Sequence, residues 1–457
     1  MKRNALIVIP FLFLFLAASA LAQQSNKSKS KDRYREKELP PKSEIVRDVE
    51  QTAGWTQLAA GQLRQVTFAL SEVMLHDMAS PPAASRFYAY SLLAGYQTAS
   101  RYQQAGFPTM QGTLNGMPVI HSFTAADSVF FPFAALWAIL ETGKGLLPSG
   151  YLLAAEQAGL EQLFRDNGLS EKIIAGSQAA ARAISGAVMN YAATDGYTQL
   201  TASPRTRPTD DPSAWQPTSP DRMTAIDPNW NTLRPFFLES AQQFRPAPPV
   251  PFSTDVNSPF MALAREVYDT GRSLTPEQRD IALFWEGNLN KMTPGTHWMN
   301  ICGLACEQQK RSFREGLIAH TALALTLNDV FISCWDEKFR GNRLRPVTAI
   351  NRALDANWQP LLETPAYPEY ISDNSMASAA AAEVLTHFLG DNRAFTDDTP
   401  IRYGLKPRAF RSFRQAAGEA SVSGLYGGIH FRDAVDQGLA TGRQIGVWTL
   451  RRLPVKQ

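Results

Sequence analysis

The segment WTQLAAGQLRQVTFALSEVMLH, residues 55–76, decides the fold class. Its apolar residues recur at roughly helical spacing until His76. The residues Ser80-Pro81-Pro82 then interrupt the pattern, and a second helical stretch follows through Tyr102. The segment therefore predicts an amphipathic helix, a turn and another helix. The regularly spaced apolar residues are Leu58, Leu63, Val66, Leu70 and Val73.

Helical patterns continue through most of the chain, and we find almost no alternation with a period of two. Between residues 195 and 235 the sequence becomes rich in Pro, Thr, Asp and Trp, and its aromatic content predicts a long ordered loop. The predicted class is all-α, a multi-helix bundle without a fixed repeat. Further helices are expected at about residues 125–142, 151–166, 170–193, 275–290, 305–338, 341–354, 374–390, 407–423 and 430–450.

The first 22 residues combine two basic residues with an apolar run from Ala5 to Ala18 and a small-residue motif that ends at Ala22. This order is typical of a signal peptide cleaved near Ala22. The run is short for a bilayer core of about 30 Å, although a retained N-terminal anchor is the alternative. We therefore expect a secreted or periplasmic protein. Residues 23–50 are polar and charged, which predicts a disordered basic linker.

The formal net charge is +3, and its basic excess lies near the N-terminus. Through Glu44, nine Lys and Arg oppose four Asp and Glu, a net of +5, which leaves −2 for the rest of the chain. We therefore expect no nucleic-acid partner. No later stretch approaches roughly 18 uninterrupted apolar residues, so we expect a soluble mature chain without a transmembrane segment.

Three cysteines occur, so disulfides do not organise this fold. Cys302 and Cys306 are spaced by four, which on a helix gives two buried thiols more often than a bridge. Both alternatives stay open from the sequence. The third cysteine is Cys334.

A basic stretch reads Lys338-Phe-Arg-Gly-Asn-Arg-Leu-Arg345-Pro346. Lys338 and Arg345 lie two helical turns apart, on one face of a helix. Two fixed cations facing one point suit a tetrahedral anion, because Arg offers a fork of donors and Lys a point charge. The alternative is a solvated basic helix end.

Two later segments place polar groups at predicted helix N-termini. Pro365-Ala-Tyr-Pro-Glu-Tyr-Ile-Ser372-Asp-Asn-Ser precedes an Ala-rich helix, and Gly427-Gly-Ile-His430-Phe-Arg precedes another. Free backbone N–H groups and the helix dipole favour an anion there, and Ser372 is a further candidate donor. His430 is a candidate nucleophile or metal ligand, although a lone His beside a Gly-Gly turn is more often structural.

In this order, the three segments resemble the signature of the vanadium-dependent haloperoxidases and type 2 phosphatidic acid phosphatases. Ser80-Pro81-Pro82, Trp215-Gln-Pro-Thr218 and Phe284-Trp285 resemble the secreted bacterial branch. The resemblance covers nearly all of residues 51–450. It implies an N-terminal helical region with a Pro-rich loop at 51–265 and a phosphatase/haloperoxidase-like helical core at 266–457.

The resemblance also implies a site that holds phosphate or vanadate among a Lys, two Arg and a Ser-Gly-His run. A further His either bonds vanadium or attacks phosphorus. Matched by position, Lys338 and Arg345 belong to the first motif, Ser372 is the serine of the second, and His430 is the vanadium-ligating or nucleophilic histidine.

Three positions depart from the family pattern: Asp373, Asn374 and Gly424 stand where the family has Gly, His and Arg. Asn374 cannot transfer a proton near neutral pH, and a general acid is worth about 10² to 10⁴-fold in rate. Asp373 and Gly424 together lower the formal charge of the site by two units. Whether Asp373 points into the site or outward stays open.

The family's haloperoxidases also carry a carboxylate that orients the key histidine, a few residues after a Phe-Trp pair. The matching position here is Asn288, and the nearby Glu286 is the candidate substitute.

The sequence as a whole predicts an exported haloperoxidase- or phosphatase-like protein that is catalytically impaired or inert. The alternative is an active enzyme, either a phosphatase through a His430 phosphoenzyme or a haloperoxidase with vanadate on His430. The expected partner is a phosphate-like anion or another small molecule, and a homo-oligomer stays open.

Overall fold

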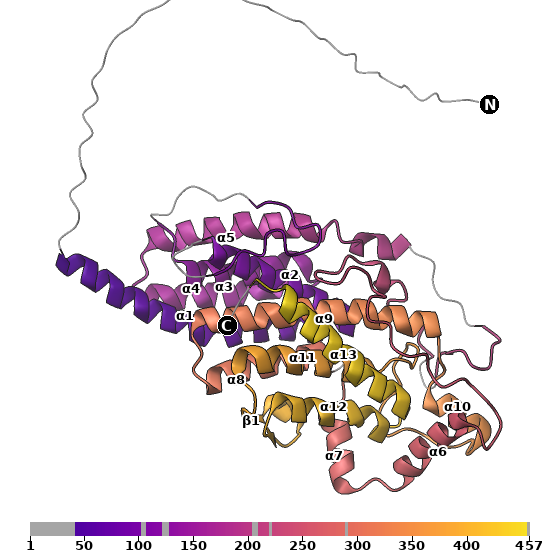
Figure 1. Cartoon of the computed structure of the whole chain (residues 1–457). Helices are drawn as coiled ribbons and strands as arrows, with labels where there is room; N and C mark the ends of the chain where they lie inside the picture. Colours follow the sequence, from indigo (N-terminus) through magenta and orange to yellow (C-terminus); the bar gives the residue numbers. More distant parts are fainter. Residues whose placement is uncertain are drawn as a thin grey trace, which may run out of the picture. The chain divides into compact units, whose positions relative to one another are not determined.

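The computed structural model describes residues 42–101, 107–120, 128–202, 209–218, 222–287 and 291–454 (Figure 1). The chain divides into two units, residues 1–49 and 50–457. Of the first unit, only the beginning of helix α1 is described. The second unit is built almost entirely of α-helices, which confirms the predicted all-α class.

Among the described residues, the first part of the second unit contains α2 to α5 and all of α1 except its beginning, and α2, α3 and α5 pack against one another. Among its described residues, the predicted loop at 195–235 contains two short 3₁₀ turns and an isolated β-bridge from Ala214 to Arg343, but no α-helix. The α-helices are α1 (Lys42–His76), α2 (Pro81–Ser100), α3 (Phe131–Leu146), α4 (Leu153–Asp166) and α5 (Glu171–Ala192), and the 3₁₀ turns are Gly150–Leu152, Tyr197–Ala202 and Trp230–Thr232.

The described residues of the remainder of the unit form eight α-helices and one small antiparallel pair of strands. The helices are α6 (Pro259–Arg272), α7 (Pro276–Phe284), α8 (Pro294–Gln308), α9 (Phe313–Gly341), α10 (Pro346–Ala353), α11 (Asp373–Leu389), α12 (Phe413–Tyr426) and α13 (Arg432–Arg452). The strands are β1 (Phe395–Asp397) and β2 (Arg408–Phe410), with a 3₁₀ turn at Thr399–Tyr403 between them.

A short sequence signal explains where four of these helices begin. A Ser or Thr is followed by Pro, and the Ser or Thr side chain accepts the N–H three residues later. Pro suits the first helical position because its missing N–H would have no partner there. The pairs are Ser80-Pro81, Ser258-Pro259, Thr275-Pro276 and Thr293-Pro294.

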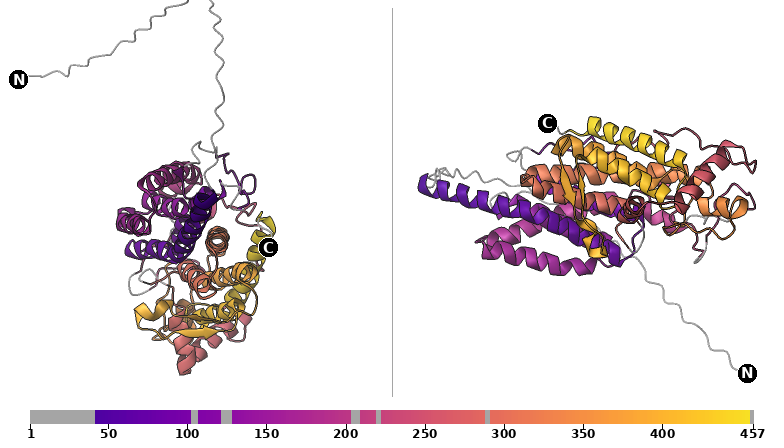
Figure 2. Two further views of the ribbon diagram at one scale, coloured as in Figure 1. Left: turned by 90° about the vertical axis from the view of Figure 1, so that its left-hand side faces the viewer. Right: turned by 90° about the horizontal axis from the view of Figure 1, so that it is seen from below.

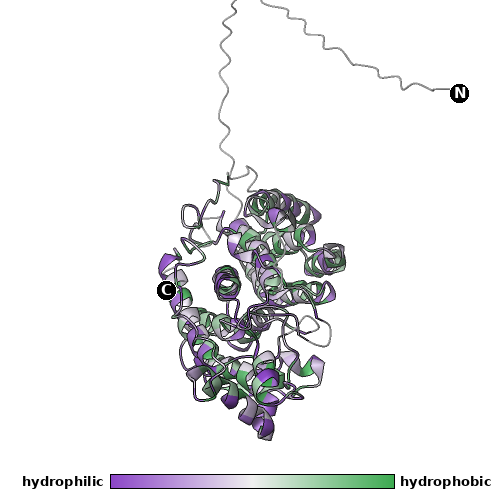
Figure 3. Cartoon of the chain, turned by 90° about the vertical axis from the view of Figure 1, so that its right-hand side faces the viewer, coloured by the Kyte–Doolittle hydropathy of each residue, from purple (hydrophilic) through white to green (hydrophobic). Residues whose placement is uncertain are grey.

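Helix α9 is the central helix of the second unit. It contacts α2, α8, α11 and α13. Figure 2 shows it between the helices of the first part of the unit and the other helices of the remainder. It is the one helix among the described residues that is long and apolar enough to cross a membrane, but its most apolar stretch is entirely buried inside the unit. The outer helices carry both hydrophilic and hydrophobic stripes (Figure 3). Helix α9 therefore has the composition of a core helix.

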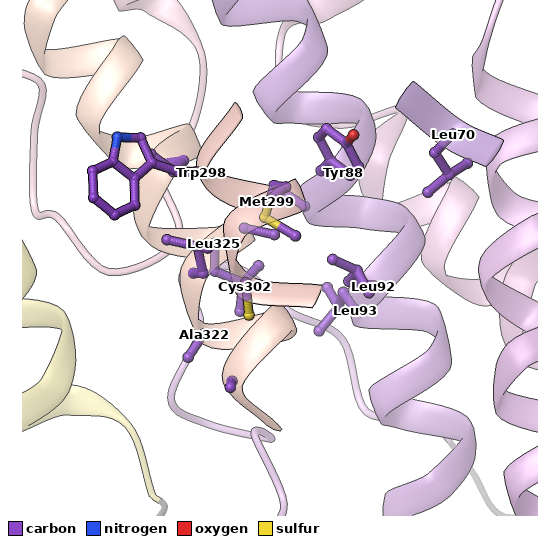
Figure 4. Packing of buried hydrophobic residues seen from close by; sticks show 14 of the residues in the cluster. Leu70, Tyr88, Leu92, Leu93, Trp298, Met299, Cys302, Ala322 and Leu325 are labelled. Atoms are coloured by element: carbon purple, nitrogen blue, oxygen red, sulfur yellow. The ribbon is translucent and has the colours of Figure 1, made fainter. Parts of the chain in front are cut away.

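The main apolar core joins α2, α8 and α9. In Figure 4, Met299 and Cys302 of α8 lie between Leu325 on one side and Leu92 and Leu93 of α2 on the other. All five residues are buried. Burying one such side chain is worth about 1.5–3 kcal/mol, so this packing fixes α9, whose far end carries Lys338.

Several predicted boundaries were wrong. Helix α1 begins at Lys42, inside the stretch predicted as a disordered linker. The helix predicted from 305 was started too early, since Ser312 caps α9 through a capping box with Glu315. Most of α8, which runs from Pro294 to Gln308, was not predicted. Helix α6 and the strand pair were not predicted.

Two other predictions stay as predictions. The signal peptide at 1–22 and the linker up to residue 41 lie outside the described residues. The predicted boundary at residue 265 falls within the second unit.

Candidate anion site

The two predicted cations converge at one end of α9. Lys338 lies in the last turns of α9 and Arg345 is the N-cap of α10, and both are fully buried. Between them, Asn342 adopts a left-handed conformation (φ 44°) that ends α9, which Asn tolerates better than most residues. The turn brings Arg345 back toward the residues that precede α11.

Backbone carbonyls hold both cations in place. The Lys338 ammonium donates to the carbonyl oxygens of Ile371 (2.6 Å) and Pro368 (3.2 Å). The Arg345 guanidinium donates to those of Tyr367 and Ile429, both at 2.9 Å. The segments before α11 and before α13 are thereby tied to the end of α9.

Asp373 points into this cluster, which settles the question that the sequence left open. Its Oδ1 atom lies 3.4 Å from Nζ of Lys338 and 3.6 Å from Nε2 of His430. The Tyr367 hydroxyl donates to Oδ2 at 3.0 Å. Burial alone raises the pKa of Asp373, but the Lys338 charge and the His430 ring outweigh it and hold that pKa well below its usual range. Asp373 is therefore a buried, ionised carboxylate.

His430 is oriented by Glu369. The Oε1 atom of Glu369 accepts from Nδ1 of His430 and from the N–H of Phe431, both at 2.9 Å. Burial raises the pKa of Glu369, but the charge of Arg343 and the bond from His430 outweigh it and lower that pKa to about 2. Because an ionised carboxylate only accepts, Nδ1 must carry the proton. The other ring nitrogen, Nε2, lies 3.6 Å from Oδ1 of Asp373 and 3.4 Å from Nη1 of Arg345.

The carboxylate that orients His430 is not Glu286, so that prediction was wrong. The ring is held by Glu369, whereas Glu286 forms an ion pair with Lys291. Glu286 follows the short helix α7, while Glu369 lies in the segment that the cations clamp before α11. Asn288, the other candidate, lies outside the described residues.

Arg343 extends the network to α13. It donates to Oε2 of Glu369 at 2.7 Å and to both oxygens of Asp433 at 2.7 and 2.8 Å. The sequence interpretation missed Arg343, Tyr367 and Glu369. A signal was available, because Arg343 lies within the quoted basic stretch and the other two lie within the segment before Ser372.

Ser372 and Asn374 form hydrogen bonds within α11 and with neighbouring segments. The Ser372 hydroxyl caps α11 and accepts from the Ser375 hydroxyl at 2.9 Å. The Asn374 amide donates to the Trp285 carbonyl and the Ser423 hydroxyl, both at 3.2 Å, and Ser378 donates to its oxygen at 3.2 Å. Oxyanion binding by Ser372 stays a prediction.

Gly424 lies directly against His430. Its carbonyl accepts the N–H groups of Ile429 (3.0 Å) and His430 (3.2 Å). A Cβ atom at 424 would lie 3.0 Å from Cδ2 of His430, which is a tight contact. Gly428 makes the intervening turn with a positive φ of 79° that favours glycine. The Gly-rich turn therefore fixes the position of the His430 ring.

The cluster around Lys338, Arg345 and His430 has a hydrogen-bond donor without a partner among the described residues. The formal charges of its other side chains, His430 apart, sum to zero. The Nη2 atom of Arg345 is buried and has no hydrogen-bond partner among the described residues, which suits an added oxyanion. Three cations nevertheless face three carboxylates, and one of those carboxylates, Asp373, lies between Lys338 and His430. The cations are Lys338, Arg343 and Arg345, and the carboxylates are Glu369, Asp373 and Asp433.

Comparisons with known proteins agree on the kind of fold. The family described as the VCPO second helical-bundle domain matches residues 319–454, which include every residue of the cluster. A bacterial vanadium-dependent iodoperoxidase is 37% identical to the chain, and the alignment covers 86% of this chain and 96% of that chain with a TM-score of 0.83. The chain belongs to the vanadium haloperoxidase superfamily.

More distant haloperoxidases show the shared fold alone. The holo and apo forms of a bacterial vanadium-dependent chloroperoxidase are each 15% identical to the chain, with TM-scores of 0.63 and 0.62. The alignments cover 82% of this chain and 93% and 94% of those chains. Among curated proteins, nothing matches. The haloperoxidase fold thus explains the meeting of Lys338, Arg345 and His430 at one point.

Proposed function

We propose that this haloperoxidase-fold protein is a catalytically impaired member of its superfamily whose oxyanion site is closed by its own carboxylate. The observation that carries the proposal is the position of Asp373, 3.4 Å from Lys338 and 3.6 Å from His430. A vanadate or phosphate would need the same ion-pair partner and the same space. The residues present therefore do not fit a bound oxyanion while Asp373 keeps this position.

Electrostatics supports the proposal. An anion entering a cluster of three cations and three carboxylates gains no net attraction, and its negative oxygens would face the Asp373 carboxylate. The second family arginine, at position 424, is missing. One oxyanion donor is typically worth about 2.7–4 kcal/mol in catalysis, so the two changes together disfavour turnover strongly.

The missing proton donor also supports impairment. Asn374 takes the position of the family's histidine, and its amide is occupied by the Trp285 carbonyl and the Ser423 hydroxyl. An amide does not transfer protons near neutral pH. We expect the loss of this acid alone to cost about 10² to 10⁴-fold in rate.

The second candidate is an active haloperoxidase or phosphatase, and the unpartnered Nη2 of Arg345 favours it. If Asp373 swung away, Lys338 and Arg345 would hold the oxyanion, and His430 would offer Nε2 as ligand or nucleophile. Bound vanadate would supply peroxide activation. The 37% identity to an iodoperoxidase makes iodide the first halide to test.

Export is part of the proposal, as are the phosphate-like ligand and the mature chain without a transmembrane segment. They rest on residues 1–22 and on the cation cluster. Expression with the full leader, followed by mass spectrometry of the chain outside the cytoplasm, tests the predicted cleavage near Ala22. The same sample gives the oligomeric state.

The function is tested by comparing the wild type with the triple variant Asp373→Gly, Asn374→His, Gly424→Arg. Vanadate and phosphate binding are measured by calorimetry. Activity is measured with p-nitrophenyl phosphate and with peroxide plus iodide or monochlorodimedone. We expect a silent wild type and a triple variant that gains vanadate binding. The single variant Asp373→Gly is expected to gain part of that binding.

His430→Ala in both backgrounds is the control for site-specific chemistry. Micromolar vanadate binding by the wild type, together with turnover that His430→Ala removes, would show that the impairment proposal is wrong and that the second candidate is right.

A further inference from the structure

A second cluster of reactive side chains lies away from the anion site. It consists of Cys302 and Cys306 of α8 and His320 of α9, whose two sulfur atoms and one ring nitrogen all lie within 4.8 Å of one another. His320 and Lys338 are on the same helix, and the rise of 1.5 Å per residue puts them about 27 Å apart. The cluster is thus separate from the oxyanion chemistry.

The His320 ring is already arranged as a ligand. Its Nδ1 atom lies 2.7 Å from the Gly316 carbonyl oxygen, and because a carbonyl only accepts, Nδ1 carries the proton. The lone pair is therefore on Nε2. That atom is buried and has no hydrogen-bond partner among the described residues. Metal-bound histidines commonly donate their other N–H to a backbone carbonyl in this way.

The two cysteines supply thiol groups from one face of α8. Both are free; Cys302 is buried and Cys306 is partly exposed. Residues four apart on a helix have Cα atoms about 6 Å apart and nearly parallel Cα–Cβ bonds. A disulfide needs its two Cβ atoms about 3.8 Å apart, so a bridge would distort α8. The structure thereby favours two thiols over the bridge that the sequence left open.

A cavity of about 120 Å³ opens beside Cys306 and His320. Gly61, Gly303 and Gly316 help to line it, and a Cβ at Gly303 would lie 3.5 Å from Nε2 of His320, so the glycine there leaves room next to this donor atom. Its charged lining residues are mostly cationic, which favours the thiolate of Cys306, the cysteine that lines the cavity. They are Arg64, Lys310 and Arg311, with Glu307 as the counter-charge.

We infer that Cys302, Cys306 and His320 bind one thiophilic d¹⁰ metal ion, with Zn²⁺ as the first candidate, and leave one coordination position facing this cavity. Three protein ligands with an open fourth position are a known zinc arrangement, and Cys₂His is one of its donor sets. Donors around tetrahedral Zn²⁺ lie roughly 3.5–3.8 Å apart. Metal binding therefore requires the present spacing to close by at most about 1 Å.

The test uses the full chain, reduced and treated with a chelator, and titrates it with Co²⁺ as a spectroscopic substitute for Zn²⁺. We expect one equivalent to bind, with a thiolate-to-cobalt charge-transfer band and the strong d–d bands of a tetrahedral ion. Zn²⁺ added afterwards should remove both. Zn²⁺ should also raise the Tm of the metal-free protein, because it binds the folded state.

Cys306→Ser is the main variant, because the residue is partly exposed and serine is close in size. We expect the charge-transfer band to weaken and Zn²⁺ affinity to fall at least about 100-fold. His320→Gln should behave alike. Cys334→Ala is the matched control, since Cys334 is a buried cysteine of α9 outside the cluster, and it should bind like the wild type. Circular dichroism of the metal-free variants checks their folding.

Three results would overturn the inference. These are no cobalt band in the reduced wild type, an unchanged band in Cys306→Ser, and a Cys302–Cys306 disulfide in protein isolated without reductant. None of these readouts uses vanadate or phosphate, so the outcome is independent of the anion site.

Discussion

The Oδ1 atom of Asp373 lies 3.4 Å from the Nζ atom of Lys338, and both side chains are buried. A buried ion pair of this kind is costly to break from one side, because the remaining charge loses its partner. If the Asp373 carboxylate is removed, an added anion takes its place as the partner of Lys338. Two measurable consequences follow for the stability of the protein.

Asp373→Asn should lower the free energy of unfolding by about 3–5 kcal/mol, because Lys338 keeps only its backbone carbonyl partners. Phosphate or vanadate should then raise the Tm of this variant and leave that of the wild type almost unchanged. Thermal unfolding with and without the anion measures both effects.

Asp195→Asn is the matched control, since Asp195 pairs with Arg86 at 2.7 Å and is equally buried. It should lose stability without any recovery on adding the anion. Equal recovery in both variants, or recovery in neither, would contradict the role given to Asp373.

Glu369 should make stability depend on pH in the acid range. Its pKa is lowered to about 2 in the folded protein, so its contribution is complete above its ordinary pKa near 4.5 and is lost as pH falls toward 2. The shift corresponds to about 3 kcal/mol. The free energy of unfolding, measured with urea between these pH values, should depend less steeply on pH in Glu369→Gln than in the wild type. The exposed Glu239→Gln should keep the wild-type slope.

Asp329 anchors the loop before α6 to α9. Its carboxylate accepts the buried N–H groups of Phe236 (2.7 Å), Phe237 (2.7 Å) and Leu238 (3.0 Å). Asp329→Ala leaves all three without an acceptor, at about 1–3 kcal/mol for each unsatisfied group. We expect a loss of at least about 3 kcal/mol by chemical denaturation. Asp329→Asn keeps one acceptor oxygen and should lose less; an equal loss would argue against the hydrogen bonds.

Gly424 and Gly418 offer a matched pair on α12. A Cβ at 418 meets nothing within 4 Å, so Gly418→Ala should stabilise the protein by about 1 kcal/mol through helix propensity. A Cβ at 424 would lie 3.0 Å from the His430 ring, which Glu369 prevents from moving. Gly424→Ala should therefore lose this gain or destabilise the protein. An equal gain at both positions would mean that the His430 ring is free to shift.

Most helices were predictable because an apolar stripe or a Ser/Thr-Pro start marks them in the sequence. Helix α6 escaped notice because it follows a stretch dense in proline, residues 246–251. The strand pair consists of two strands of three residues, too short for an alternating pattern to show. Helix α8 was predicted only over its last turn and α9 was started too early, because neither Gly nor Pro marks the boundary between them and that boundary depends on the capping box of Ser312.

The site residues that belong to a recognised sequence motif were predictable. Lys338, Arg345 and His430 were assigned to one site by their resemblance to the family's motifs, and the structure brings them together. The direction of Asp373 and the partner of His430 were not predictable, because both depend on the path of residues 367–371 over the end of α9. That path is set by carbonyl contacts to Lys338 and Arg345, which only the folded chain creates.

The contact between Gly424 and His430 also sets an order on any mutational route back to a site with more cations. An arginine that appeared at 424 while Asp373 remained would find a carboxylate beside the same ring and pair with it, which would seal the cluster further. Only after Asp373 is lost would that arginine face an incoming anion. The loss of Asp373 opens the site by itself, whereas an arginine at 424 does not. Selection for anion binding would therefore act on position 373 before position 424.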